Sequence, residues 1–485
     1  MTRRPIPPQD QLWLELDRPT NLLVITSVMW TSEPVDPAAL RALVQDRLLD
    51  RYPVFRQRAV DGLLPGTAHW EDDPEFDLDR HLRVATVPAP GDRTALERFV
   101  GEQRSVPLDR SRPLWALHLL QGYGTGSALV QRFHHAMADG IRLTQVALGI
   151  LDPVDGDDRS PIARVGGAAP VHEGEHLSAQ LADLARQSGG GPVLRAAGSV
   201  ASLLPASVRP GHLLDLTAET ALTVLHTAGS VVKIAAWNNP HTRLEGAVGV
   251  AKTAVWGDPV PLELLTGIAH ETGTSVGDVC TALVAGAVSS YLDEQGVLDG
   301  ETADDLAWMV PVNLEPFDAE LPADLGNHFA LVLAVLPHAP VPFRERLAEV
   351  HTRMARIRDS YEPMITFGIS RGIAVTPAPL GSWISDSLAG KAVGVLTNVP
   401  GPRVRMALAG APVTGMVGWA PTSAQQALTV CVFSYAGQVT VGFGTDRAVI
   451  DDPERLVAAF AAEVGEAAAR NTPIPTTAAA TSRRS

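Results

Sequence analysis

Two adjacent histidines, His134 and His135, precede an Asp139–Gly140 pair in the stretch RFHHAMADGI. An imidazole has an ordinary pKa of about 6.5, so near neutral pH it is largely an uncharged proton acceptor and suits the work of a general base. The carboxylate of Asp139 would then hold the loop in place by pairing with an arginine, rather than contact a substrate. The same residues also fit a metal site, or a plain turn between a strand and a helix.

The elements around this motif weigh against metal binding. The segment SALVQRFHH (127–135) predicts a β-strand, in which successive side chains point to opposite faces. His134 and His135 therefore cannot easily bind one ion together, and no second ligand cluster is visible, so we expect no metal. Asp139 also fits the N-cap of a helix over 141–151, worth about 1 kcal/mol, and Gly140 permits a close approach or a positive φ. On the residues alone the helix cap is the stronger interpretation and the general base the alternative, and the strand phase does not say which histidine faces a cavity.

Helix and strand signals continue on both sides of a connector rich in Gly, Pro and Asp. The stretch RPLWALHLLQGYGTGSALVQRFHH (112–135) predicts a hairpin, and no helix start follows GYGTG, so we do not expect a phosphate loop there. Asp36 starts one helix, and Ser275 with Asp278 forms a capping box at the start of the strongest helical pattern. Further elements are expected as strands at 305–313, 328–336 and 392–398, a hairpin at 427–446 and a helix at 452–470.

The composition describes a globular protein large enough for more than one domain. The chain has 485 residues, 45% hydrophobic and 19% charged, and this length supports two or three packed cores. Its formal net charge of −15 argues against a nucleic-acid-binding protein, which needs a basic face.

The cysteines and apolar stretches indicate a reducing compartment and no membrane span. Cys280 and Cys431 stand in separate apolar runs and no CxxC pair occurs, so we expect buried, inert thiols and no structural zinc. The N-terminal stretch lacks the apolar core of a signal peptide. The most apolar long stretch, 220–237, carries His226 and Lys233 and is too short and polar to span a bilayer. We expect a cytoplasmic protein able to touch a membrane surface.

The histidine motif resembles HHxxxDG of the CoA-dependent acyltransferase superfamily, which includes chloramphenicol acetyltransferase and the condensation domains of peptide synthetases. The whole chain is more specifically similar to the bacterial wax ester synthase/diacylglycerol acyltransferase family. The segments that carry this similarity occur in the family's order: IPPQDQLWLELDRPTN (6–21), FRQRAV (55–60), PLDRSRPLWALHLLQG (107–122), HTRLEGAVGVAK (241–252), SVGDVCTALVAGAVSSYL (275–292), LGNHFALVLAVLP (325–337) and TNVPGP (397–402).

The resemblance implies an α/β fold of two chloramphenicol-acetyltransferase-like domains, each a mixed sheet with flanking helices, with a tunnel between them. We accordingly expect an N-terminal acyltransferase domain over 1–152, a helical connector over 153–242 and a C-terminal acyltransferase-like domain over 243–470. The tail, 471–485, should be disordered.

The resemblance also implies the reaction, which is transfer of a fatty acyl group from acyl-CoA to a hydroxyl of diacylglycerol or a long-chain alcohol. It assigns the general base to His135 and supporting roles to His134, Asp139 and Gly140, with acyl-CoA as co-substrate and no further cofactor. One alternative is an acyltransferase for a specialised hydroxyl or amine acceptor with a CoA- or carrier-bound donor. The other is a non-catalytic lipid-binding protein, which the intact His135 and Asp139 disfavour. We expect peripheral attachment to a membrane or lipid droplet and no nucleic-acid partner.

Substrate-binding candidates lie in the later segments. In TNVPGP, Asn398 is a candidate for a place beside the reaction centre, although the segment also fits a plain turn. Arg403 and Arg405 are candidates for CoA phosphates or a solvated strand edge. Asp278 is a further candidate. The family usually has Asn-Asp where this chain has Gly277-Asp278, so efficiency or substrate range differs here if that asparagine shapes the acyl site.

Two other patterns carry weaker signals. GISRG (368–372) fits the G-x-S-x-G pattern of a serine nucleophile, but Pro377 and Pro379 follow too soon for the helix that this nucleophile requires, so we reject a serine hydrolase. Arginines at 344, 346, 353, 356 and 358 give one helix a basic face, for which solvation is the default and contact with anionic lipid the alternative.

Overall fold

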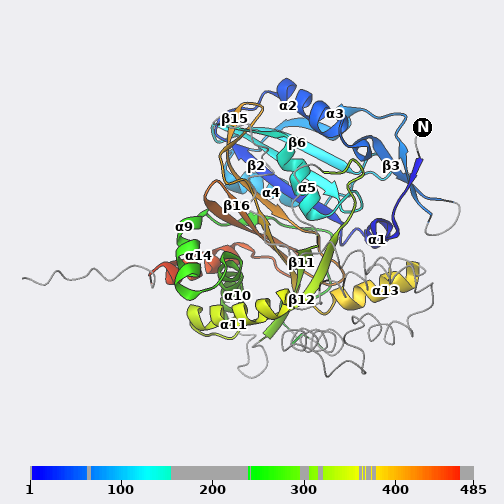
Figure 1. Cartoon of the computed structure of the whole chain (residues 1–485). Helices are drawn as coiled ribbons and strands as arrows, with labels where there is room; N and C mark the ends of the chain where they lie inside the picture. The colour runs from blue at the N-terminus through cyan, green and yellow to red at the C-terminus, as the bar shows by residue number, and fades with distance from the viewer. Residues whose placement is uncertain are drawn as a thin grey trace, which may run out of the picture.

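The structure is a computed structural model (Figure 1). It describes residues 3–62, 67–154, 237, 239–240, 242–294, 305–314, 321–359, 363, 366, 373 and 378–469. The expected connector, 153–242, falls almost wholly outside the described residues, as do the apolar stretch 220–237 except its last residue, GISRG at 368–372 and the tail 471–485.

The first large sheet combines strands from both ends of the chain. Its order is β5 (Leu82–Thr86), β6 (Trp115–Tyr123), β7 (Gly126–His134), β2 (Val24–Thr31), β15 (Ala411–Trp419), β14 (Met406–Leu408) and β8 (Leu151–Pro153). Only β5 and β6 pair in parallel, so the sheet is mixed. In Figure 1, β15 lies beside the blue and cyan strands of the N-terminal part. The chain therefore crosses the domain boundaries expected from the sequence, because strands within 243–470 complete the sheet of 1–152.

The second large sheet belongs to the C-terminal part. Its order is β10 (Val260–Pro261), β17 (Gln438–Thr445), β16 (Leu428–Tyr435), β13 (Gly394–Pro400), β11 (Asp305–Asn313) and β12 (Phe329–Pro337), and β9 (Val255–Trp256) also pairs with β17. β13 runs parallel to β11 and β16, and the other pairs are antiparallel. A small third sheet has the order β1 (Arg3–Pro5), β4 (His69–Asp72) and β3 (Gln57–Val60).

Helices flank both large sheets. They are α1 (Pro8–Leu16), α2 (Pro37–Val44), α3 (Leu78–His81), α4 (Arg93–Arg104), α5 (Gly140–Gly149), α9 (Leu262–Thr272), α10 (Val276–Glu294), α11 (Phe343–Arg358), α13 (Ala378–Ala389) and α14 (Glu454–Ala469), with a π turn at Gln45–Leu49 and a 3-10 turn at Pro53–Arg56. The expected fold of two mixed sheets with flanking helices is confirmed.

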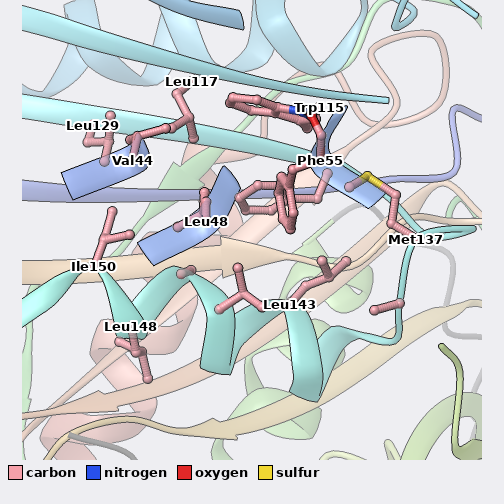
Figure 2. Close-up of a cluster of buried hydrophobic side chains, with 14 of the residues drawn as sticks. Val44, Leu48, Phe55, Trp115, Leu117, Leu129, Met137, Leu143, Leu148 and Ile150 are labelled. Atoms are coloured by element: carbon pink, nitrogen blue, oxygen red, sulfur yellow. Dashed lines mark hydrogen bonds between the residues drawn. The ribbon is translucent and has the colours of Figure 1, made fainter. Parts of the chain in front are cut away.

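Two helices cover opposite faces of the first sheet. Leu129 belongs to the same buried cluster as Leu143 and Leu148 of α5, whose side chains Figure 2 draws. Val130, the next residue of β7, packs instead with Leu96 of α4. Because neighbouring strand residues point to opposite faces, α5 and α4 lie on the two sides of the sheet. Each such leucine contributes about 1.5–3 kcal/mol when it is fully buried.

The local signals of the sequence reappear as elements. The predicted hairpin is β6–β7, and the side chain of Asp36 accepts the N–H groups of Ala38 and Ala39 at the start of α2. At α10, Ser275 Oγ accepts the backbone N–H of Asp278 over 3.1 Å and Asp278 Oδ2 accepts that of Ser275 over 3.2 Å, which is the predicted capping box. Among the described residues, no single helix is long and apolar enough to cross a membrane. α9 and α10 meet that test only as a pair bent by 101°.

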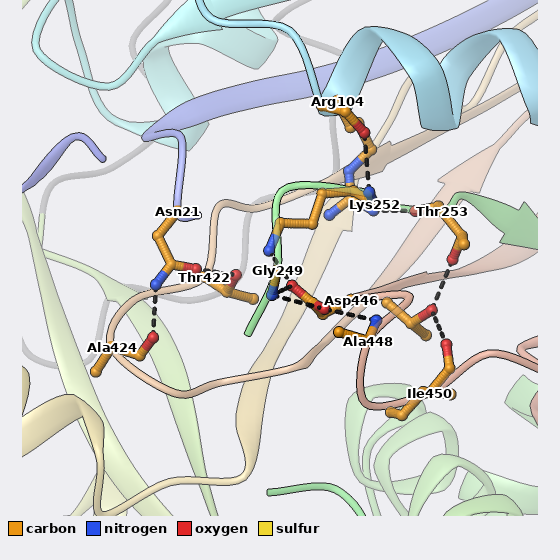
Figure 3. Close-up of polar contacts among 12 residues, drawn as sticks. Asn21, Arg104, Gly249, Lys252, Thr253, Thr422, Ala424, Asp446, Ala448 and Ile450 are labelled. Atoms are coloured by element: carbon orange, nitrogen blue, oxygen red, sulfur yellow. Dashed lines mark hydrogen bonds and ion pairs between the residues drawn. The ribbon is translucent and has the colours of Figure 1, made fainter. Parts of the chain in front are cut away.

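Contacts of Arg104 join the N- and C-terminal parts beside a buried ion pair within the C-terminal part (Figure 3). Lys252 Nζ lies 2.5 Å from Asp446 Oδ2, and both side chains are buried. Arg104, at the end of α4, donates to the carbonyl of Thr253 and lies over the ring of Trp419, 5.9 Å from its centroid. Burial lowers the pKa of Arg104 to about 10, which still leaves it charged at neutral pH.

Candidate active site

A cavity of about 340 Å³ lies between the two large sheets. Strands β2, β7 and β15 border it from the first sheet and β11, β12 and β13 from the second, while α5 and α11 close its sides. The side chains that border it are mostly apolar, and its volume is in the range of small-molecule sites. The arrangement matches the tunnel expected between the two halves.

His135 borders this cavity just beyond the end of β7. Its backbone N–H donates to the carbonyl of Leu23 over 2.8 Å, which fixes the chain as it leaves the strand. The imidazole stacks on the indole of Trp13 with ring centroids 4.3 Å apart and contacts Phe329 at 5.1 Å. Among the described residues that border the cavity, His135 is the one imidazole.

The surroundings of His135 keep the imidazole uncharged. Burial lowers its pKa to about 4, and the neighbouring His134 acts in the same direction, against smaller opposing effects of its own backbone and of Asn327. At neutral pH the ring therefore carries a free lone pair. Its Nδ1 is enclosed by protein and has no hydrogen-bond partner in the described part of the chain, so Nε2 is the nitrogen left for the cavity.

His134 points away from the cavity into the protein. Its Nδ1 accepts the backbone N–H of Ala136 over 3.0 Å, and its Nε2 lies 3.6 Å from Asp17 Oδ2. Burial alone would raise the pKa of Asp17, but His134, the N–H of Leu23 and Arg110 together lower it below its ordinary value. His134 thus contacts the end of α1, and the two histidines do not share a site.

Asp139 ties the histidine motif to the C-terminal part of the chain. Its carboxylate accepts the N–H of Arg142 over 2.9 Å as the N-cap of α5, and the N–H of His328 over 2.8 Å. Burial raises the pKa of Asp139, against the lowering effect of these two N–H groups and of the Arg142 charge. Gly140 begins α5 and borders the cavity. It needs neither a positive φ nor a close approach, because an added Cβ would meet only Ile25 Cδ1, at 3.8 Å.

Asn327 holds the backbone of His135 from the other side. Its Nδ2 donates to the His135 carbonyl over 2.9 Å and to Asp10 Oδ1 over 2.8 Å. Asp10, on α1, is 3% exposed, and burial raises its pKa to about 7, with Asp139 adding to the shift and Asn327 and Arg4 opposing it. Trp13, Asn327 and Asp10 were not singled out from the sequence, although they stand in segments 6–21 and 325–337 that carried the family resemblance.

A second cavity, of about 140 Å³, adjoins the first. It is bordered by α1, by the end of α13, and by β11 and β12. Trp13 and Phe329 border both cavities. The ring that stacks on His135 therefore also stands at the boundary between two apolar spaces.

The other predicted site residues are distributed differently. Asn398 borders the large cavity, and its Nδ2 would lie 3.2 Å from a Cβ on Gly277. A side chain at 277, where the family usually has asparagine, would press on Asn398. Asp278 does not border the cavity. It pairs with His351 at 2.8 Å and with Arg358, which does border the cavity, at 3.1 Å.

Arg403 and Arg405 are exposed in the turn after β13, and neither borders either described cavity.

Both cysteines are buried, and burial raises the pKa of each to about 12, which leaves unreactive thiols. No group of three or more His, Cys, Asp or Glu side chains suited to a metal ion occurs in the described parts of the chain.

Comparison with known proteins identifies the family. Residues 6–280 match the wax ester synthase/diacylglycerol acyltransferase catalytic domain, and residues 325–466 match the WS/DGAT C-terminal domain. A probable diacylglycerol O-acyltransferase of Mycobacterium tuberculosis is 27% identical over 407 residues, covering 81% of this chain and 79% of that protein. A second, putative one from the same species is 28% identical over 418 residues, covering 84% of this chain and 85% of that protein.

Solved structures share the fold. A wax ester synthase/diacylglycerol acyltransferase from Marinobacter aquaeolei matches with a TM-score of 0.67 and 22% identity, over 96% of this chain and 99% of that one. The first condensation domain of the calcium-dependent antibiotic synthetase matches with a TM-score of 0.58 and 16% identity, over 97% of both chains. Because the catalytic-domain match alone spans more than half of the sequence, the chain belongs to the wax ester synthase/diacylglycerol acyltransferase family and is an acyltransferase.

Proposed function

We propose that His135 is the general base with which this acyltransferase moves a fatty acyl group from acyl-CoA to a hydroxyl of diacylglycerol or a long-chain alcohol. The products are triacylglycerol or a wax ester. The observation that carries the proposal is the uncharged imidazole of His135 at the wall of a large apolar cavity. A base held in this way contributes typically 10²–10⁴-fold to the rate.

The reaction follows from the position of this nitrogen. His135 Nε2 removes the hydroxyl proton as the oxygen forms a bond to the thioester carbonyl carbon, and the bond from that carbon to sulfur then breaks. The imidazolium returns the proton to the CoA thiolate. With a pKa of about 4 for His135 against about 8.5 for an ordinary thiol, this last transfer is downhill. These steps account for every bond and proton without a covalent acyl-enzyme and without a cofactor besides acyl-CoA.

The two cavities suit two apolar substrates that meet at His135. One chain would lie in the space between the sheets and the other beside α1 and α13, with Trp13 between them. Asn327 and Asp139 would act as positioning residues, because Asn327 binds the carbonyl of His135 and Asp139 binds the backbone N–H of His328 next to Asn327. His134 would act in the same way through Asp17.

We further propose that the enzyme takes its acceptor from a membrane or lipid-droplet surface through α13. Leu380 is 43% exposed and Trp383 66% exposed on this helix, whose last turn borders the second cavity. An indole at a water–lipid boundary buries an apolar ring and keeps its N–H hydrated. The basic face of α11 fits this role less well, because four of its arginines pair with carboxylates: Arg344 with Glu271, Arg346 with Glu463, Arg353 with Asp305 and Glu349, and Arg358 with Asp278.

Incubation of the purified chain with palmitoyl-CoA and a panel of acceptors tests the function. The panel contains diacylglycerol, hexadecanol, a hydroxylated small molecule and a primary amine, and mass spectrometry resolves the products. We expect triacylglycerol or palmityl ester from the native chain, and loss of at least 10²-fold in rate from a folded His135→Ala variant. Full activity of that variant would refute the mechanism, and acylation of the amine or small molecule alone would replace the proposed acceptor.

A further inference from the structure

One polar pair interrupts the apolar cavity face of the first sheet. Strands β2 and β7 place three pairs of residues directly opposite each other along this face: Ile25 with Phe133, Ser27 with Gln131, and Met29 with Leu129. The first and last pairs are apolar, and both Ser27 and Gln131 border the large cavity. Buried polar groups are normally hydrogen-bonded, so a serine and a glutamine between apolar pairs of such a wall require hydrogen-bond partners.

The pair satisfies only part of its own hydrogen-bonding capacity. Ser27 Oγ donates to Gln131 Oε1 over 3.1 Å. Gln131 Nε2 is buried and has no hydrogen-bond partner among the residues that the structure describes, and the residue is 1% exposed. If the two ends of the amide are exchanged, Nε2 binds Ser27 and the amide oxygen becomes the unpartnered atom. A hydroxyl group, which both donates and accepts, satisfies the pair in either orientation.

The position of the pair sets where along a substrate this hydroxyl would lie. Gln131 and His135 are four residues apart along one strand face, which corresponds to about 13 Å. Extended chains advance about 1.2 Å per bond, since three backbone bonds span about 3.6 Å, so the hydroxyl would stand roughly ten carbons from the reacting group.

The surrounding wall favours an alkyl chain over the CoA arm. Leu143 and Ala147 of α5 border the same cavity as the apolar pairs of β2 and β7. A pantetheine arm has two amides and would leave polar groups against this wall at a cost. A chain with a single oxygen places that oxygen at Gln131 and methylenes elsewhere.

We infer that Ser27 and Gln131 form a subsite for a mid-chain hydroxyl on a long-chain substrate, so that the enzyme prefers a chain hydroxylated near carbon 10 over the plain chain. The inference rests on the proposed acyl transfer and adds its substrate class. Both an acyl donor and an alcohol could supply such a chain. The subsite is a specificity determinant and takes no part in the proton transfers.

Competition between chains tests the subsite. In one arm the native enzyme receives equal amounts of 10-hydroxystearoyl-CoA and stearoyl-CoA with hexadecanol. In the other it receives 1,10-octadecanediol and 1-octadecanol with palmitoyl-CoA. In one arm we expect a preference on the order of tenfold for the hydroxylated chain, which corresponds to one hydrogen bond to a buried group. The arm that shows this preference identifies whether the acyl donor or the alcohol occupies the subsite. The isomers hydroxylated at carbon 2 and carbon 17 should show no such preference.

Variants at the pair and a matched control complete the test. Gln131→Leu and, separately, Ser27→Ala should bring the ratio of kcat/KM for hydroxylated and plain chains close to one. Thr144→Val also removes a hydroxyl from the cavity wall, but that hydroxyl already donates to the Gly140 carbonyl over 2.7 Å, so the ratio should stay at its native value. An equal rise in KM for both chains in Gln131→Leu would assign the amide to the CoA arm and overturn the inference, as would a native ratio near one. A native enzyme that transfers no chain at all would instead refute the proposed function.

Discussion

Asp139 of the histidine motif accepts a hydrogen bond from the backbone N–H of His328, 189 residues further along the chain, over 2.8 Å. The same carboxylate caps α5, and Asn327, the neighbour of His328, binds the carbonyl of His135. The base is therefore held between its own strand and a loop from the other half of the molecule.

This arrangement predicts that Asp139→Asn lowers stability and activity together. An amide keeps one acceptor oxygen but presents an NH₂ group to the second N–H, so we expect a loss of about 1–3 kcal/mol. Thermal unfolding and kcat/KM measure it, and the pH profile of kcat/KM should keep its shape. The matched control is Asp36→Asn, at an exposed cap where asparagine serves about as well. A shifted pH profile with unchanged melting temperature would show that Asp139 acts in the chemistry itself.

The depressed pKa of His135 predicts an unusual acid limb. A base must be unprotonated, so kcat/KM should stay level from pH 8 down to about pH 5.5 and fall only as the pH approaches about 4, the pKa of the free enzyme's His135. Rates measured in buffers of constant ionic strength, with circular dichroism as a check on folding, test this. A limb near pH 6.5 would mean that the imidazole is hydrated rather than desolvated in the resting enzyme.

The stacking of Trp13 on His135 predicts a double effect of Trp13→Ala. The substitution joins the two cavities and removes the ring that fixes the imidazole, so kcat should fall at least tenfold and the chain-length optimum should move to longer chains. Leu12→Ala is the control. Leu12 borders only the second cavity, so its loss should move the optimum with little effect on kcat. If both variants lower kcat equally, Trp13 has no special role beside the base.

The raised pKa of Asp10 predicts that Asp10→Asn stabilises the protein at alkaline pH. Burial raises this pKa from 3.8 to about 7, so folding favours the protonated form, and its benefit is full below pH 3.8 and disappears as pH rises through 7. The penalty above pH 7 is roughly 4 kcal/mol at most, at 1.36 kcal/mol per unit. Asparagine has no charge to bury. The melting temperature of Asp10→Asn should exceed the native value at pH 8 and match it near pH 3.5, below the ordinary pKa of 3.8; an advantage that does not change with pH would contradict this.

Docking through α13 predicts that Leu380→Asp with Trp383→Asp abolishes flotation with liposomes that contain diacylglycerol, while transfer to a detergent-dispersed acceptor persists. Since apolar burial supplies the binding, 0.5 M salt should not release the native protein. Val84→Asp, which changes a valine 52% exposed on β5, is the control and should float normally. Complete release by salt would point to arginines instead.

The sequence alone determined the features that depend on neighbours along the chain. The caps at Asp36, Asp139 and Ser275 and the β6–β7 hairpin follow from residues within a few positions, because capping and tight turns are local interactions. The order of the family segments then predicted two mixed sheets and an acyltransferase, and both are confirmed. The assignment of the base to His135 came from the resemblance and remains a proposal.

Tertiary structure decided what no local pattern contains. β15 pairs with β2, which joins residues almost 400 positions apart. The sequence of β15 does not specify which strand it pairs with, because backbone hydrogen bonds between strands are the same for any neighbour. Asn327 and Trp13 reach His135 from opposite ends of the sequence. The sequence of α11 predicts a basic face, but in the folded protein carboxylates from other elements pair with its arginines. In the sequence, Gln131 is an unremarked residue of a predicted strand. Its Nε2 is distinguished by being buried without a hydrogen-bond partner among the described residues, and whether a polar group has a partner depends on everything packed around it.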